Sequence, residues 1–282
     1  MNNKVHTARL SIASNALLIT MKLVVGIISG SVSIISEAIH SSMDLMAAVI
    51  AYFSVRVSDN PPDSRHPYGH GKFENISGVI EALLILIAAV WIIFEAIRKI
   101  TGEETVVDNI AIGSAVMLIS AIINSLVSRR LYKVARETGS LALEADALHL
   151  KTDVYTSLGV AAGLLLILLT DIMWLDPVVA ILVALFIIRE AYRLLKRAYS
   201  PLLDVSWQDE DVKELEDVLH ELNVNYHELR TRISGNYRFI DFHIEIPKDQ
   251  SVEDAHNYCD LIEEKLMARF ENLNVTIHVE PK

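Results

Sequence analysis

Long apolar stretches separated by short polar segments fill the first two hundred residues of this chain. Crossing about 30 Å of hydrocarbon takes roughly 20 helical residues. Six stretches reach that length, at residues 10–29, 33–56, 76–98, 108–128, 142–169 and 177–198. Runs of this length predict transmembrane helices. No signal peptide is expected, since the first apolar run is already long enough to span the membrane.

The hydrophobic pattern changes after Ser200 and Pro201, where a water-soluble region begins. Residues 209–223 have the apolar spacing of an amphipathic helix, and residues 226–234 and 237–246 read as strands joined by a turn at 234–236. Ser251 opens a further helix that reaches about Phe270, and residues 274–280 alternate as a last strand. The prediction is an α-helical membrane protein with six transmembrane helices, residues 1–204. A cytoplasmic α-β-β-α-β domain of ferredoxin-like or metallochaperone-like type follows, residues 205–282.

Composition supports a membrane protein and orients it. Hydrophobic residues make up 52% of the chain, and the mean hydropathy is +0.35. Lysine and arginine gather before the first stretch, after the second, fourth and sixth, and much less in the other connections. Positively charged loops stay in the cytoplasm. Both termini are therefore expected in the cytoplasm of a multi-pass protein of the cytoplasmic (inner) membrane.

The tail carries most of the negative charge. Residues 205–282 hold 18 acidic and 8 basic side chains, and the whole chain has a net charge of −11. This acidity argues against nucleic acid as a partner. The single cysteine, Cys259, excludes an intramolecular disulfide and suits a reducing compartment.

Two of the apolar stretches contain the same polar motif, a histidine followed four residues later by an aspartate. The pairs are His40 with Asp44 and His149 with Asp153. In a helix each pair lies on one face, one turn apart. Counting about 1.5 Å per residue from opposite ends of their stretches places both pairs near mid-membrane. Two imidazoles and two carboxylates that converge there would form a four-ligand site for a divalent metal, zinc first.

Two other interpretations of these motifs are weaker. Paired histidines and aspartates can serve as polar contacts between helices, but burying an aspartate near the bilayer centre costs about 2.5 to 3.5 kcal/mol. An enzyme is not expected, because a four-ligand site leaves no open position for an activated water. The remaining intramembrane polar residues are expected to form helix contacts or face the bundle and are not assigned as metal ligands: Asn15, Asn124, Glu81 and Glu95.

The tail offers further candidate ligands. Period-two alternation puts Ile240, Phe242, Ile244 and Ile246 on one face of the second strand and Asp241, His243 and Glu245 on the other. On the last strand Val275, Ile277 and Val279 are expected to face inward, with His278 and Glu280 outward. Outward histidines on neighbouring strands suit a metal cluster at a dimer interface. The tail is small for an independent core, so dimerisation is expected.

These motifs together resemble the cation diffusion facilitator family, in detail the bacterial zinc/iron efflux proton antiporters. The resemblance rests on both His/Asp motifs, on Asp63-Ser-Arg-His66-Pro-Tyr-Gly-His70-Gly-Lys72 between the second and third stretches, and on Leu203-Asp204. It implies a homodimer in the lipid bilayer that exports a divalent ion in exchange for protons. It also implies a loop metal site, a tail metal site and a salt bridge, formed by Asp63, His66 and His70; by His227, His243, His256, His278 and Glu280; and by Lys72 with Asp204.

Zinc is the expected cargo, and zinc is also expected as a structural or regulatory metal in the tail. A broader exporter of Fe²⁺, Cd²⁺, Mn²⁺, Co²⁺ or Ni²⁺ is the alternative within transport, because residues 128–139 lack the histidines frequent in zinc-selective branches. A membrane metal sensor that binds ions without moving them is the alternative outside transport. Vesicle flux distinguishes the sensor from both exporters.

Overall fold

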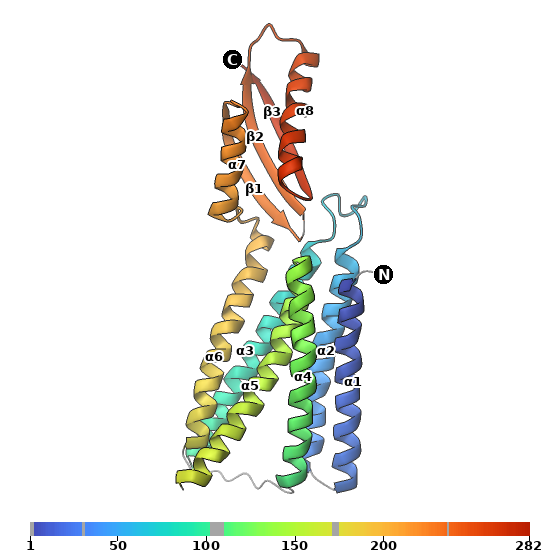
Figure 1. Ribbon diagram of the computed structural model, residues 1–282, viewed down its shortest axis with the longest axis vertical. Coiled ribbons are helices and arrows are strands. Elements are labelled where there is room, and N and C mark those ends of the chain that lie inside the picture. Colours follow the sequence, from blue (N-terminus) through green and yellow to red (C-terminus); the bar gives the residue numbers. More distant parts are fainter. Residues whose placement is uncertain (1–2, 30–31, 102–109, 171–174, 236) are drawn as a thin grey trace. The chain divides into compact units, whose positions relative to one another are not determined.

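The chain forms two compact units, which are described separately (Figure 1). The computed structural model describes residues 3–29, 32–101, 110–170, 175–235 and 237–282. Inside the helices some further side chains lie outside the description, and His40 is one of them. The first unit contains residues Met1–Asp59 and Phe73–Ala198, and the second contains Asn60–Lys72 and Tyr199–Lys282. The expected division between residues 204 and 205 stays a prediction.

Six long helices build the first unit, as the apolar stretches predict. They are α1 (Asn3–Ser29), α2 (Val32–Ser58), α3 (Lys72–Ile100), α4 (Ile110–Thr138), α5 (Leu141–Thr170) and α6 (Leu175–Tyr199). Three segments in the described part of the chain are long and apolar enough by themselves to cross a membrane, namely Asn3–Ile28, Lys72–Arg98 and Ala115–Thr138. Helices α2 and α5 carry the two His/Asp motifs within largely apolar sequence.

Small side chains let the helices of this unit approach closely. One buried cluster joins α1, α2, α4 and α5 through residues such as Ala8, Val55, Ala135 and Ala147. A second cluster joins α3, α5 and α6 through residues such as Ala82, Ala145 and Ala191. Alanine and other small residues are typical of helix interfaces in membranes, where close packing replaces the hydrophobic effect. Helix α5 belongs to both clusters and therefore sits between the two groups of helices.

A buried carboxylate holds four helices together near their ends. Glu74 on α3 accepts hydrogen bonds from Lys4 at 3.3 Å, Ser58 at 2.8 Å and Ser140 at 2.6 Å. The backbone N–H of Ala142 adds a contact of 3.4 Å. Glu74 therefore has donors for both carboxylate oxygens, which offsets much of the cost of burying its charge.

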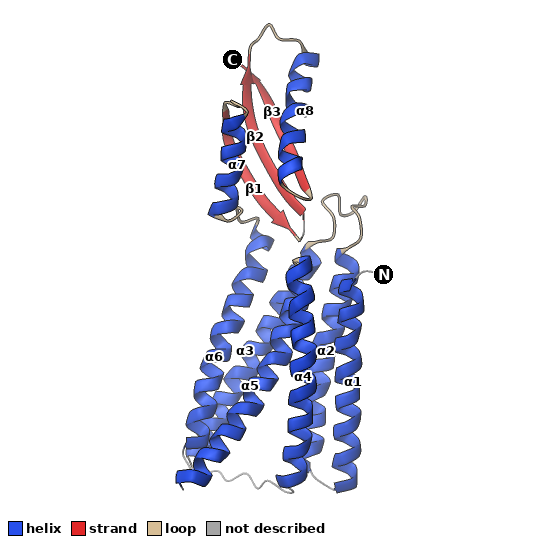
Figure 2. Ribbon diagram, in the orientation of Figure 1, coloured by secondary structure: helices blue, strands red, loops and turns tan. Residues whose placement is uncertain are grey.

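The second unit contains a three-stranded sheet with two helices on one face (Figure 2). After a short 3-10 turn, η1 (Ser200–Leu203), the elements are α7 (Asp209–Glu221), β1 (Tyr226–Ser234), β2 (Tyr237–Ile246), α8 (Val252–Arg269) and β3 (Leu273–Pro281). Strand β2 is central, antiparallel to β1 and parallel to β3. The expected α-β-β-α-β order is confirmed, and Ser251 caps α8 by accepting the N–H of Asp254.

The apolar face of the sheet packs against α7 and α8. Ile240, Phe242 and Ile244 of β2 are buried against Leu219 of α7 and Ile262 of α8. The Cys259 thiol is also buried in this core, and its burial raises the pKa of the thiol above the usual range. On β3 the inward prediction is right for Val275 and Ile277, which pack against the core. Val279 lies beside buried Ile244 on the same face, and it is 37% exposed because it lies near the end of the sheet.

The segment Asn60–Lys72 packs against the hairpin between β1 and β2. A side chain at Gly71 would place its Cβ 2.5 Å from the carbonyl oxygen of Ser234 and 2.8 Å from the Cα of Gly235. Only glycine permits this approach. The Tyr68 ring lies edge-on to Phe239, with 5.6 Å between centroids, and the Arg232 guanidinium lies 4.5 Å from the centre of the Tyr68 ring.

Candidate metal centres

A histidine and two aspartates meet in the interior of the helical unit. Asp44 on α2 and His149 on α5 are buried, and the His149 Nε2 lies 3.0 Å from the Asp44 Oδ1. Asp153 stands one turn after His149 on α5. One ligand atom from each of the three residues lies within 4.8 Å of the others. The spacing can accommodate a single ion bound by all three.

Helix geometry brings these residues together. Helices α2 and α5 pack against one another, and the four-residue spacing aims each motif at one face. His40 stands one turn before Asp44 on α2, but its side chain lies outside the described residues. Asn124 on α4, expected only as a helix contact, donates its Nδ2 to Asp153 Oδ2 at 3.4 Å. Such a donor orients a metal-binding carboxylate. The sequence held no spacing motif that would have connected Asn124 to this site.

The loop residues Asp63, His66 and His70 form a second group within 4.8 Å. Asp63 lies 3.3 Å from the Nδ1 of His66 and 3.4 Å from the Nε2 of His70. Its Oδ1 also accepts the backbone N–H of His66 at 2.7 Å and of Arg65 at 2.8 Å. These two backbone donors hold the pKa of Asp63 below its usual range. Gly69, at φ +83°, supplies the left-handed turn that brings His70 back towards Asp63.

The third group lies on the outward face of the tail sheet. His227, His243 and Glu280 offer ligand atoms within 4.8 Å of one another. The Nε2 of His227 lies 3.3 Å from Glu280, and the Nδ1 of His243 lies 3.2 Å from it. A β-bulge between His227 and Arg230 shifts the register by one residue and sets His227 directly opposite His243. Without this extra residue, Glu228 would face His243 instead.

Of the two remaining tail candidates, His278 lies beside the tail cluster and His256 does not belong to it. His278 is paired with His243 across β2 and β3, with 4.6 Å between ring centroids, so it borders the tail cluster. His256 is exposed on α8 and lies 3.6 Å from Asp260, and it is not one of the three clustered residues in this single chain. Its assignment to a tail site stays a prediction. His220, without a match in the resemblance, packs near Tyr226.

The implied salt bridge joins the loop to the turn that follows α6. Lys72 Nζ donates to Asp204 Oδ1 at 2.8 Å, and Arg232 lies 3.8 Å from the same oxygen. The hydrogen bond from Lys72 holds the pKa of Asp204 below its usual range. Asp204 has a φ of +53°, a left-handed conformation that aspartate tolerates better than most residues.

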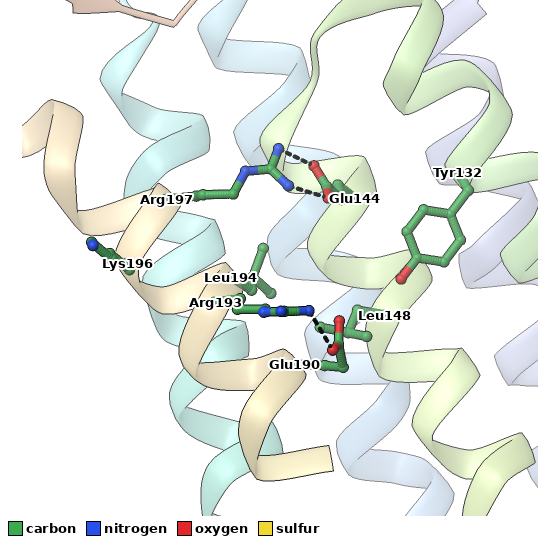
Figure 3. A pocket seen from close by; sticks show the side chains of 8 residues that line it. All are labelled: Tyr132, Glu144, Leu148, Glu190, Arg193, Leu194, Lys196 and Arg197. Atoms are coloured by element: carbon green, nitrogen blue, oxygen red, sulfur yellow. Dashed lines mark hydrogen bonds and ion pairs between the residues drawn. The ribbon is translucent and has the colours of Figure 1, made fainter. Parts of the chain in front are cut away.

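A cavity of about 400 Å³ between α4, α5 and α6 is separate from these groups (Figure 3). Arg197 contacts Glu144 through two hydrogen bonds of 2.6 and 2.7 Å, and Arg193 donates to Glu190 at 3.0 Å. None of the predicted metal ligands is among the described residues that line it. The side chains that line this cavity are paired charges and apolar groups. They offer a metal ion fewer available donors than the three clusters do.

The donor sets of the three clusters suit divalent metals. Each combines at least one imidazole with a carboxylate, a mixture that zinc and its first-row neighbours accept. The cation efflux transmembrane domain model matches residues 8–203, and the cation efflux cytoplasmic domain model matches residues 207–282. The chain belongs to the cation diffusion facilitator family. Members of this family are transporters, so the chain is a membrane exporter of divalent metal cations and not an enzyme.

Relatives align with nearly the whole chain. The uncharacterized transporter sll1263 of Synechocystis sp. is 33% identical and covers 98% of this chain and 92% of its own length. The cation-efflux pump FieF of Shewanella oneidensis is 30% identical over 97% of this chain and 93% of its own. Among solved structures, the metal-bound C-terminal domain of the CzcD transporter from Thermotoga maritima is 33% identical. It covers 27% of this chain and 94% of that one, with a TM-score of 0.25.

Proposed function

We propose that this cation diffusion facilitator is a Zn²⁺/H⁺ antiporter. As a homodimer in the cytoplasmic membrane, it would export zinc by alternating access, with both termini in the cytoplasm. Residues 1–204 carry the transport site His40, Asp44, His149 and Asp153, and residues 205–282 form the metal-binding, dimerising domain. The observation that carries the proposal is the convergence of Asp44, His149 and Asp153 within 4.8 Å inside the helical unit.

The choice of zinc follows from the donor set. Imidazole nitrogen with carboxylate oxygens suits zinc better than the oxygen-only sites that magnesium and calcium prefer. Iron, cadmium, manganese, cobalt and nickel accept similar ligands and are the alternative cargo. Asp63, His66 and His70 would take up or deliver ions at the loop. The tail residues His227, His243, His256, His278 and Glu280 would hold zinc that stabilises the dimer.

The contact between His149 and Asp44 supports proton coupling. A separation of 3.0 Å between Nε2 and Oδ1 is a hydrogen bond, which requires a proton between the two atoms. A metal ion bound to both atoms must displace that proton, since imidazole binds metals only through an unprotonated nitrogen. Ion binding and proton binding therefore exclude one another at this pair. Exposure to an acidic medium on the outer side would favour proton binding and release of the metal.

Zinc flux into proteoliposomes with an imposed pH gradient tests the proposal. Asp44→Ala and Asp153→Ala should each abolish gradient-driven flux, because each removes a charged ligand. Asp249→Ala is the matched control, since Asp249 is exposed in the turn before α8 and belongs to none of the clusters. Wild-type flux that ignores the pH gradient and moves no protons would refute antiport.

The same assay separates the alternatives. No zinc flux from the wild type, together with flux of iron, manganese or cadmium, would identify a broader exporter of the same family. Binding without flux for every one of these metals would favour the sensor.

A further inference from the structure

A buried polar cluster lies between α1, α3 and α5, outside the three candidate metal centres. Asp146 stands on α5 three residues before His149, and Glu81 lies on α3. Ser11 on α1 is beside Asp146, and Asn15 follows one turn later on the same helix face. The exposed fraction is 0% for Asp146, Glu81 and Ser11 and 1% for Asn15.

The Ser11 hydroxyl interacts with the Asp146 carboxylate, without a close, well-aligned hydrogen bond between them. Neither Oε2 of Glu81 nor Nδ2 of Asn15 has a hydrogen-bond partner among the described residues. Oε1 of Glu81 accepts a hydrogen bond from the Ser77 hydroxyl at 3.1 Å. The contrast with Glu74 is informative, because residues of α1, α2 and the start of α5, together with Ser140, supply that carboxylate with four donors. The fold can satisfy a buried carboxylate fully, and it supplies fewer donors to Glu81 and Asp146.

Leaving these groups unpaired is costly. A buried polar atom without a hydrogen bond destabilises the fold, and an unpaired buried charge destabilises it more. Asp146 is also close enough to Glu81 to repel it electrostatically, and His149 offsets only part of that repulsion. A purely structural cluster would be more stable with apolar residues. The cost is understandable if a ligand of opposite charge completes the cluster during part of the transport cycle.

The chemistry of the cluster identifies the class of ligand. When both are ionised, two carboxylates carry a charge of −2, which a divalent cation neutralises. The hydroxyl of Ser11 adds a neutral oxygen, so the donors are oxygen, the kind preferred by hard or hydrated divalent ions. Zinc binds such a set less tightly than one that includes imidazole. An ion would therefore pass readily from this cluster to His149, about one helical turn or 5 Å further along α5.

We propose that Asp146, Glu81 and Ser11 form a staging site that holds the divalent cation before it reaches the transport site. The cluster lies towards the ends at which α1, α3 and α5 begin (Figure 1). Asn15 borders it and helps to hold the hydration shell of the ion. The inference rests on the proposed function, because it takes Asp44, His149 and Asp153 as the destination of the ion.

A thiolate introduced at the staging site reports the ion directly. In the full chain with Cys259→Ser, Ser11→Cys should give the ultraviolet charge-transfer absorption of a Cd–thiolate bond when Cd²⁺ is added. Cys259 is the single cysteine, so the absorption can arise only at position 11. Adding Asp146→Asn should remove the absorption, whereas adding Asp44→Ala should leave it. The proposal of a staging site would be overturned if the folded Ser11→Cys protein gave no Cd–thiolate absorption. It would also be overturned if the absorption remained after Asp146→Asn was added.

Transport kinetics with Ser11 intact give an independent test. Asp146→Asn and Glu81→Gln keep the side-chain shape, and each should raise the zinc KM at least fivefold with a much smaller change in kcat. An unchanged KM, with only the pH dependence of flux altered, would overturn the cation site and identify the pair as proton carriers. If Asp44→Ala leaves flux intact, the proposed transport site fails. In that case the Cd–thiolate absorption still tests whether the staging site binds a cation, independently of the transport site.

Discussion

Water reaches the three candidate metal centres to different degrees, although all three combine imidazole with carboxylate. Asp44 and His149 are buried between helices, whereas Asp63 is exposed and Glu280 is partly exposed. A buried charge pair with a missing partner is far more costly than an exposed one. The centre in the helical unit is therefore the one that is most shielded from water, and the loop and tail centres are open to solvent.

The loop centre should depend on Asp63 at neutral pH. The pKa of Asp63 lies below its usual range, so its stabilising charge is fully present above the ordinary aspartate pKa of about 3.9 and is lost only as the pH falls through a lower value. Asp63 therefore stays ionised in mild acid and keeps its charge available to a metal ion. Asp63→Asn keeps one oxygen for the two backbone donors but loses the charge.

Calorimetric titration of the full chain with zinc should show one fewer ion per chain for Asp63→Asn, or at least tenfold weaker binding at one site. Ser64→Ala is the control, because Ser64 is exposed in the same loop. Unchanged stoichiometry and affinity would remove Asp63 from the ligand set.

At the scale of single residues, sequence spacing predicted most of what the structure brings together. A four-residue interval in a helix fixes relative position, so Asp153 could be placed beside His149 before any fold was known. Asn124 and Asp146 could not be assigned in the same way. Their roles depend on which helix faces which neighbour, and a local interval carries no information on that.

At the scale of elements, one β-bulge determines the tail centre. Alternation along β2 correctly predicted that His243 faces away from the core. Alternation along β1 could not predict that His227 faces the same side, because the extra residue reverses which face the side chains before the bulge point to. Glu228 takes up the irregularity with a φ of +50°. No glycine marks the position, so the sequence gives no sign of the bulge.

The N-cap of α8 offers a test of element stability. Ser251→Ala removes the hydroxyl that accepts the N–H of Asp254 at 3.1 Å. The loss should cost about 1 kcal/mol, and Ser251→Asp should retain most of the capping energy. Hydrogen exchange at the amides of α8 in the full chain measures the difference. Equal protection in wild type and Ser251→Ala would show that packing alone fixes this end of the helix.

The salt bridge between Lys72 and Asp204 connects the start of α3 to the turn after α6. Both side chains are at least one-third exposed, so the pair contributes at most about 1 kcal/mol. Because the pKa of Asp204 is lowered, this contribution is present at neutral pH and disappears as the pH falls through the lowered value.

The double variant Lys72→Asp/Asp204→Lys should keep more zinc flux than either single variant, since it restores the pair with reversed charges. Asp204→Asn serves as the control for backbone strain, because asparagine also tolerates the left-handed conformation. Additive losses in the double variant would indicate that the two residues act independently.

At the scale of the whole molecule, charge is distributed very unevenly. The tail region, residues 205–282, carries 18 acidic against 8 basic side chains. In the proposed homodimer, two such tails would repel one another, and salt would screen that repulsion. The dimer should therefore associate at least threefold more tightly at about 0.5 M than at about 0.05 M salt, as measured by analytical ultracentrifugation in detergent. Tighter association at low salt would mean that attractive ion pairs dominate the interface.

The order of helices and strands could be predicted from the sequence. Which distant segments pack into the same unit could not. Each apolar stretch and each alternating strand is a local signal, and the structure confirms them. The segment Asn60–Lys72 groups with the tail because Gly71 meets Gly235 and Tyr68 meets Phe239. These pairs are more than 150 residues apart in sequence, and no periodicity connects positions so distant.

The contact between Tyr68 and Phe239 bears on how the tail can be dissected. A recombinant fragment that begins at residue 205 would lack the segment that covers Phe239, which is only 8% exposed in the full chain. The hairpin of the fragment would then expose the Phe239 ring next to Arg232. Self-association of such a fragment in solution would partly reflect this artificial surface, and cutting the chain there would create a contact that the intact transporter never offers.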